Sequence, residues 1–137
     1  MIANYATHAM EAPMEQAVAY PQIVGQVVRY RRKQAEYGLS KFSDQLGLSP
    51  SGWNRVESGA TTITVTQLRR AARTLGVEPW EVLRDADQLA RRVERDQGVR
   101  VLDELPKGAA KAALWILGGA AIFALAAAVL SSGSGES

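Results

Sequence analysis

Side chains that hold metals or act as nucleophiles are scarce in this chain of 137 residues. The chain has no cysteine and a single histidine, His8, which lies in an N-terminal stretch without regular hydrophobic periodicity. This residue content excludes thiolate zinc sites, disulfide frameworks and catalytic dyads built on histidine. We therefore expect a protein that is not an enzyme and that binds no metal or cofactor.

The charged side chains are unevenly distributed, although the formal net charge of the whole chain is only +2. Residues 21–76 contain nine basic and three acidic residues, a net charge of +6. Residues 77–106 contain five arginines and eight carboxylates, a net charge of −3. The sequence thus predicts a basic domain followed by an acidic neck.

Hydrophobic periodicity and helix caps predict five helices that would position the basic side chains. The expected helices cover residues 21–36, 39–46, 51–57, 64–76 and 79–95. Ser49 is a favourable N-cap for the third helix, and Thr64 with Gln67 forms a capping box for the fourth. A tight turn joins the second and third helices, which is the arrangement of a helix-turn-helix domain. The fifth helix is longer than such a core requires, so we expect its excess length to pair two copies as a homodimer.

Residues 46–59, LGLSPSGWNRVESG, resemble the helix-turn-helix of the Cro and phage-repressor (XRE-type) family, whose pattern is roughly L-G-V-S-x-S-x-I-S-x-I-E-x-G. The resemblance extends over about residues 23–83, in register and without a gap. It implies an all-α, five-helix DNA-binding domain in a transcription regulator of bacterial or phage origin. In that family the second helix of the motif enters the major groove of double-stranded DNA.

The resemblance also implies which residues contact the DNA. By position, the base-reading residues are Pro50, Ser51, Gly52, Asn54 and Arg55, and the phosphate-binding residues are Lys41, Gly59, Thr61 and Thr62. Arg55 is the strongest candidate because a guanidinium can donate two hydrogen bonds to O6 and N7 of guanine. Ser51 can reach a base edge or a phosphate, whereas Pro50 and Gly52 have no side-chain donor.

Other residues of this segment are expected to support the fold. The resemblance pairs Glu57 with Arg32 of the first helix, and we expect Trp53 in the core. The basic run 29–33 fits a DNA-contacting patch and a solvated helix face equally well. Leu39 stands where the family usually has a phosphate-anchoring glutamine, which leaves room for a helix-turn-helix fold that binds a protein instead.

Residues 112–130 form an unbroken run of 19 apolar residues or glycines. As a helix, this run would span about 28 Å, close to the thickness of a bilayer core. Lys107 and Lys111 precede the run, and the tail that follows carries no basic residue. These features predict a transmembrane helix, with the lipid bilayer of the inner (cytoplasmic) membrane as a partner and the N-terminal domain in the cytoplasm. The alternative is a buried, alanine-rich helix of a soluble oligomer.

The expected organisation has five parts along the chain. They are a disordered leader (1–20), a helix-turn-helix domain with an extended fifth helix (21–96), a juxtamembrane neck (97–111), the transmembrane helix (112–130) and a short tail (131–137). This combination predicts a membrane-anchored, sequence-specific DNA-binding regulator. One alternative is a scaffold similar to the RodZ family, whose helix-turn-helix binds a cytoskeletal or other protein partner. Another is a soluble repressor with an apolar oligomerisation tail.

Overall fold

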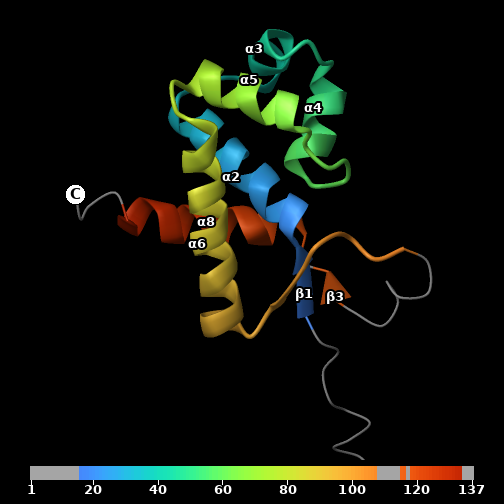
Figure 1. The fold of residues 1–137 in the computed structure, drawn as a ribbon, viewed down its shortest axis with the longest axis vertical. Helices are drawn as coiled ribbons and strands as arrows, with labels where there is room; N and C mark the ends of the chain where they lie inside the picture. The colour runs from blue at the N-terminus through green and yellow to red at the C-terminus, as the bar shows by residue number, and fades with distance from the viewer. Residues whose placement is uncertain (1–15, 108–114, 117, 134–137) are drawn as a thin grey trace, which may run out of the picture.

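A computed structural model of the protein describes residues 16–107, 115–116 and 118–133. The elements are β1 (Gln16–Ala19), α2 (Tyr20–Gln34), α3 (Leu39–Gln45), α4 (Pro50–Glu57), α5 (Val65–Leu75), α6 (Pro79–Gln97), β2 (Arg100–Leu102), β3 (Trp115–Ile116) and α8 (Gly119–Gly133). Helices α3, α4 and α5 gather at one end of the molecule, and α2 runs from this end to the strands (Figure 1). Three parts of the expected organisation lie outside the described residues. They are the leader before residue 16, the neck at residues 108–111 and the tail after residue 133.

The five helices expected between residues 21 and 95 are present as α2 to α6. Their ends follow the local signals. The Ser49 hydroxyl accepts a hydrogen bond from the Gly52 amide at 3.1 Å, which caps α4. Thr64 and Gln67 exchange two hydrogen bonds at the start of α5. Gly76 ends α5 with a φ of +74°, a left-handed conformation that glycine adopts without a steric penalty.

The expectation of an all-α fold is wrong, because three short segments form a parallel sheet in the order β2-β1-β3. Ala17 lies opposite Arg100 of β2, and Gln16 lies opposite Trp115 of β3. Residues 16–19 were expected in the leader. Their side chains at 17, 18 and 19 are buried, but a segment of four residues is too short for periodicity to distinguish a strand from a loop.

The expected transmembrane helix over 112–130 is also wrong, and with it the localisation in the inner membrane. Among the residues that the structure describes, no helix combines the length and the apolar character needed to cross a membrane. The apolar run is divided, since residues 115–116 pair in the sheet and α8, with 15 residues, starts at Gly119. The run was misinterpreted because its hydropathy suits a helix covered by protein as well as a helix covered by lipid.

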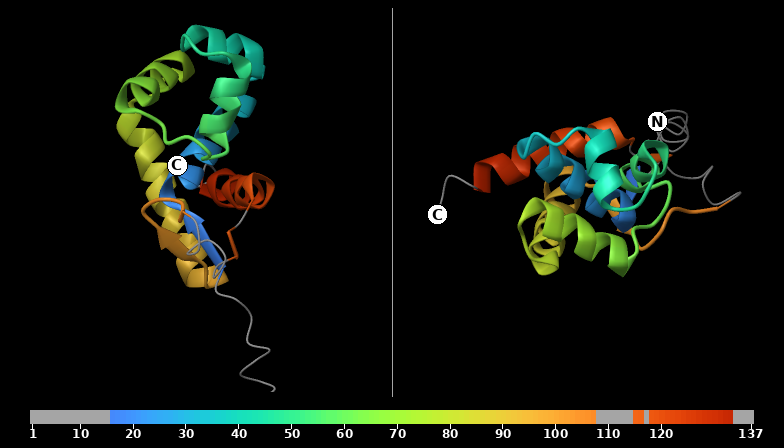
Figure 2. Two further views of the ribbon diagram at one scale, coloured as in Figure 1. Left: turned by 90° about the vertical axis from the view of Figure 1, so that its right-hand side faces the viewer. Right: turned by 90° about the horizontal axis from the view of Figure 1, so that it is seen from above.

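Helix α8 packs against α2 and α6 of the same chain (Figure 2). Ile122 and Ala126 of α8 are buried in the core. The Phe123 ring lies beneath two cations of α2, with the Arg29 guanidinium 5.2 Å and the Lys33 ammonium 5.3 Å from its centroid. These cation–π contacts and the apolar burial hold α8 along α2.

The inner face of α6 is also covered within the chain. Leu89 and Val93, in the part of α6 that exceeds a five-helix core, are buried in the same core as Ile122 of α8. The excess length of this helix therefore serves intramolecular packing. Leu89 and Val93 are thus not available to pair two copies, and the pairing through this helix stays a prediction.

Candidate nucleic-acid interface

A buried ion pair fixes α4 on α2. The Glu57 carboxylate is 1% exposed and accepts hydrogen bonds from Arg32 Nε at 2.7 Å and Arg32 Nη2 at 3.0 Å. The Trp53 indole donates a third hydrogen bond to the same carboxylate at 2.7 Å, and Arg32 Nη1 donates to the Tyr37 carbonyl at 2.8 Å. The two charges thus neutralise each other with nearly every polar atom satisfied, which burial of an ion pair requires. Arg32, Glu57 and Trp53 belong to the scaffold.

Helix α2 crosses the C-terminal end of α4 at very close range. A Cβ atom on Gly25 would lie 2.5 Å from the carbonyl oxygens of Val56 and Glu57, so only glycine fits at this crossing. The Gln26 side chain, fully buried, donates to the Glu57 carbonyl at 2.7 Å and satisfies one of the free carbonyls at the end of α4. Our sequence interpretation missed Gln26, although a glutamine within the apolar stripe of α2 was a detectable signal.

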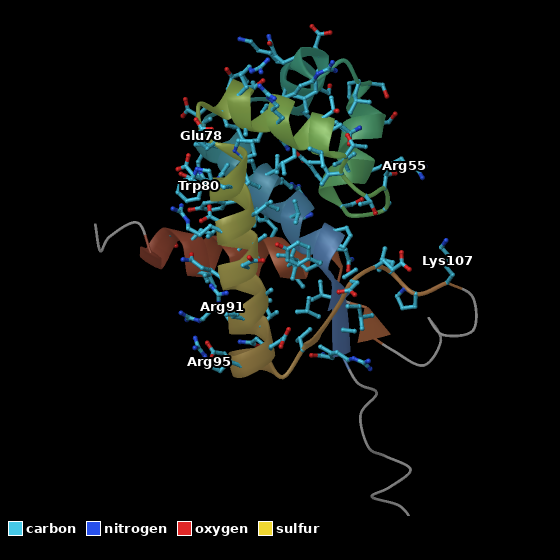
Figure 3. The ribbon with its side chains drawn as sticks, viewed as in Figure 1. Arg55, Glu78, Trp80, Arg91, Arg95 and Lys107 are labelled. Atoms are coloured by element: carbon cyan, nitrogen blue, oxygen red, sulfur yellow. The ribbon has the colours of Figure 1, made fainter. Side chains whose placement is uncertain are left out.

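With this inner face anchored, the opposite face of α4 is turned to solvent. Pro50, Ser51, Asn54 and Arg55 are exposed and Gly52 is half-buried, so the five residues expected to read bases lie on one side of the helix. Ser51 Oγ lies 3.4 Å from Ser49 Oγ, close to the N-cap. Arg55 projects away from the body of the molecule, on the opposite side from Trp80, Arg91 and Arg95 of α6 (Figure 3).

The loop that follows α4 is bound back to that helix. The Thr61 amide donates to the Arg55 carbonyl at 3.1 Å, and Arg55 Nε donates to the Thr61 hydroxyl at 3.4 Å. Thr61 and Thr62 are exposed, as is Lys41 on α3. The residues expected to contact phosphates, apart from Gly59, are therefore accessible.

Gly59 has a structural role instead. It is buried, its φ is +80°, and a Cβ atom would lie 2.5 Å from Gln22 Cγ of α2. Its amide already donates to the Val56 carbonyl at 3.1 Å. This amide is not free to bind a phosphate, and the glycine serves the close contact between α2 and the loop.

The basic run 29–33 is largely engaged in contacts within the chain. Arg31 Nη2 lies 2.6 Å from an oxygen of Asp85 on α6, Arg32 pairs with Glu57, and Arg29 and Lys33 cover Phe123. The sequence left two interpretations open for this run, a DNA-contacting patch and a freely solvated helix face. Neither describes the contacts that the structure shows. The other basic residues of segment 21–76 are exposed on α3, α4 and α5, and they are Lys41, Arg55, Arg69, Arg70 and Arg73.

In the comparison with family models, residues 23–86 match a family described as a helix-turn-helix domain. This part of the chain extends from α2 into α6 and contains the whole face described above. This match supports a helix-turn-helix domain of the DNA-binding kind in residues 23–86. The comparisons with curated proteins and with solved structures gave no match.

Proposed function

We propose that this protein is a sequence-specific transcription regulator of the Cro-like type, which places α4 in the major groove of double-stranded DNA. The observation that carries this proposal is the division of α4 into two faces. Glu57 and Trp53 are locked into the core, while Asn54 and Arg55 are exposed together on the other side. A rigid helix with free hydrogen-bonding side chains is what direct readout of base edges requires.

The exposed side chains of α4 have distinct roles in this proposal. The Asn54 carboxamide has no hydrogen-bonding partner among the described residues, and it matches N6 and N7 of adenine. Arg55 matches O6 and N7 of guanine. Ser51 reaches a base edge or a phosphate near the start of the helix. Pro50 and Gly52 are short, and they let the start of α4 approach the base pairs closely.

Phosphate contacts would set the position of α4 in the groove without selecting a sequence. Lys41 on α3 and Thr62 on the loop after α4 are both exposed. We expect Lys41→Ala to weaken binding to all DNA sequences by a similar factor. The slope of log affinity against log salt should become shallower by about 0.9 if this lysine neutralises one phosphate.

We also propose that two copies bind together, with half-sites about one helical turn apart. The inner face of α6 is buried, so the pairing surface would be its outer face, where Trp80 is 59% exposed and Leu83 is 38% exposed. Exposed apolar side chains of this size are common at contacts between proteins. Sedimentation of the wild type and of Trp80→Ala tests this: a dimer that Trp80→Ala weakens supports it, and a monomer on DNA contradicts it.

Selection of genomic DNA fragments on the full chain, at near-physiological salt, tests the function itself. We expect enrichment of a short, paired motif, and loss of one base preference in Arg55→Ala at a cost of about 1–3 kcal/mol. Arg92→Ala is the matched control, because Arg92 is an exposed arginine of α6, away from α4. Absence of any enriched motif with the wild type would overturn the proposal and favour a helix-turn-helix that binds a protein.

A further inference from the structure

We propose that Thr61 is a positioning residue that orients Arg55 toward a guanine, rather than a phosphate ligand. This inference rests on the proposed function of α4 and names the base that its strongest reading residue selects. The structural basis is the pair of contacts between Thr61 and Arg55, one from the main chain and one from the side chain.

The loop after α4 holds the Thr61 hydroxyl in a defined place. Two groups bind the Arg55 carbonyl, since the Thr61 amide and the Ser58 hydroxyl both donate to it at 3.1 Å. The Ala60 amide donates to the Ser58 hydroxyl at 3.4 Å, and buried Gly59 fixes the loop against Gln22 of α2. The hydroxyl of an exposed residue is thus carried by an anchored backbone, directly beside the Arg55 side chain.

The contact uses one edge of the guanidinium and leaves the other edge open. Arg55 Nε donates to Thr61 Oγ1 at 3.4 Å, and this is the only hydrogen bond of the Arg55 side chain to other described residues. A guanidinium is planar, with five N–H donors in fixed directions. When Nε is held, the free donors on Nη1 and Nη2 point outward as a pair, which matches O6 and N7 of one guanine.

The benefit of this contact is a reduced loss of side-chain freedom on binding. A long arginine side chain loses rotamer freedom when it is fixed on a base edge, and a partner that already restricts its plane lowers that loss. A hydroxyl that only bound a phosphate would add affinity for every sequence. A hydroxyl that aligns Arg55 adds affinity chiefly where a guanine is present.

Thr61→Val removes the hydroxyl with little change in shape and provides the test. Affinities are measured for the selected site and for the same site with its guanine replaced, over a series of salt concentrations. We expect Thr61→Val to reduce the preference for guanine about three- to tenfold, the range for one hydrogen bond, without changing the salt slope. Thr61→Ser, which keeps the hydroxyl, should retain most of the preference.

A double-mutant cycle with Arg55→Ala separates positioning from direct contact. If Thr61 acts through Arg55, Thr61→Val has no further effect on the guanine preference in the Arg55→Ala background. Equal weakening on all sequences, those without the guanine included, would instead make Thr61 a phosphate ligand and overturn the inference. The salt slope stays unchanged in this case too, because a neutral hydroxyl displaces no counterion. Thr62→Val is the matched control and should show that uniform pattern.

The outcomes for the wild type and for the variant are distinguishable. A wild-type protein without any base preference contradicts the proposed function, and this inference with it. A wild-type protein that prefers guanine, together with a Thr61→Val variant that keeps the full preference, contradicts this inference alone. Urea unfolding of each variant verifies that it is folded before the comparison is made.

Discussion

At the scale of single residues, Glu57 joins two helices that are distant in sequence. Its carboxylate accepts three hydrogen bonds from Arg32 and Trp53 inside the core. Glu57→Ala would leave the Arg32 guanidinium buried and uncompensated, so we expect the free energy of unfolding to fall by about 3–5 kcal/mol. Urea unfolding measures this. Asp96→Ala, which breaks exposed ion pairs of α6, is the control and should leave the unfolding midpoint unchanged.

Tyr20 makes folding sensitive to alkaline pH. Burial, and then the hydrogen bond to Asp87 at 2.5 Å and the charge of that carboxylate, raise the pKa of the Tyr20 hydroxyl. The unfolded state ionises near its ordinary pKa of about 10, before the folded state does, so this stabilisation is complete below about pH 10 and decreases above it. Tyr20→Phe should therefore lose less stability than the wild type between about pH 8 and pH 10.5 in urea unfolding. Equal losses would show that Tyr20 does not contribute.

At the scale of elements, the start of α4 depends on one hydroxyl. Ser49 Oγ accepts from the Gly52 amide, and Ser49→Ala should lower the free energy of unfolding by about 1 kcal/mol. Ser49→Asp keeps a capping oxygen and should retain the stability. We expect the same aspartate to weaken DNA binding, because its charge would lie at the end of α4 that approaches phosphates. Unfolding and DNA titration of both variants provide the check, and a stable Ser49→Asp that binds DNA normally would contradict this orientation of α4.

At the scale of the whole molecule, α8 completes the core that α2 and α6 begin. Its inner face buries Ala126, whereas Ala124 on the same helix is exposed. Ala126→Asp would place a carboxylate in the apolar core and should lower the free energy of unfolding by about 3 kcal/mol or more. Ala124→Asp should change it by less than about 0.5 kcal/mol. Equal effects of the two variants in thermal or urea unfolding would show that α8 does not dock through this face.

Local interactions explain the part of the fold that could be predicted from the sequence. The caps at Ser49 and Thr64, the glycine at 76 and the apolar periodicity define α2 to α6 to within a few residues. The face of α4 followed directly, because a buried Trp53 and Glu57 leave Asn54 and Arg55 outside. Each of these signals acts between residues a few positions apart, where hydrogen bonding and helical geometry decide the outcome.

Only the tertiary structure decided which segments pair in the sheet and what covers the apolar run and the basic run. The strands at 16–19, 100–102 and 115–116 are far apart in the chain, and each is too short to reveal itself alone. The apolar run at 112–130 and the basic run at 29–33 could each be interpreted in two ways from the sequence. In the fold, α8 lies on α2, and two cations of the basic run, Arg29 and Lys33, lie over the Phe123 ring. Hydropathy and charge determine that such segments need partners. Long-range packing decides which segments cover them. Apolar burial is non-directional, so the local sequence does not specify the partner segment.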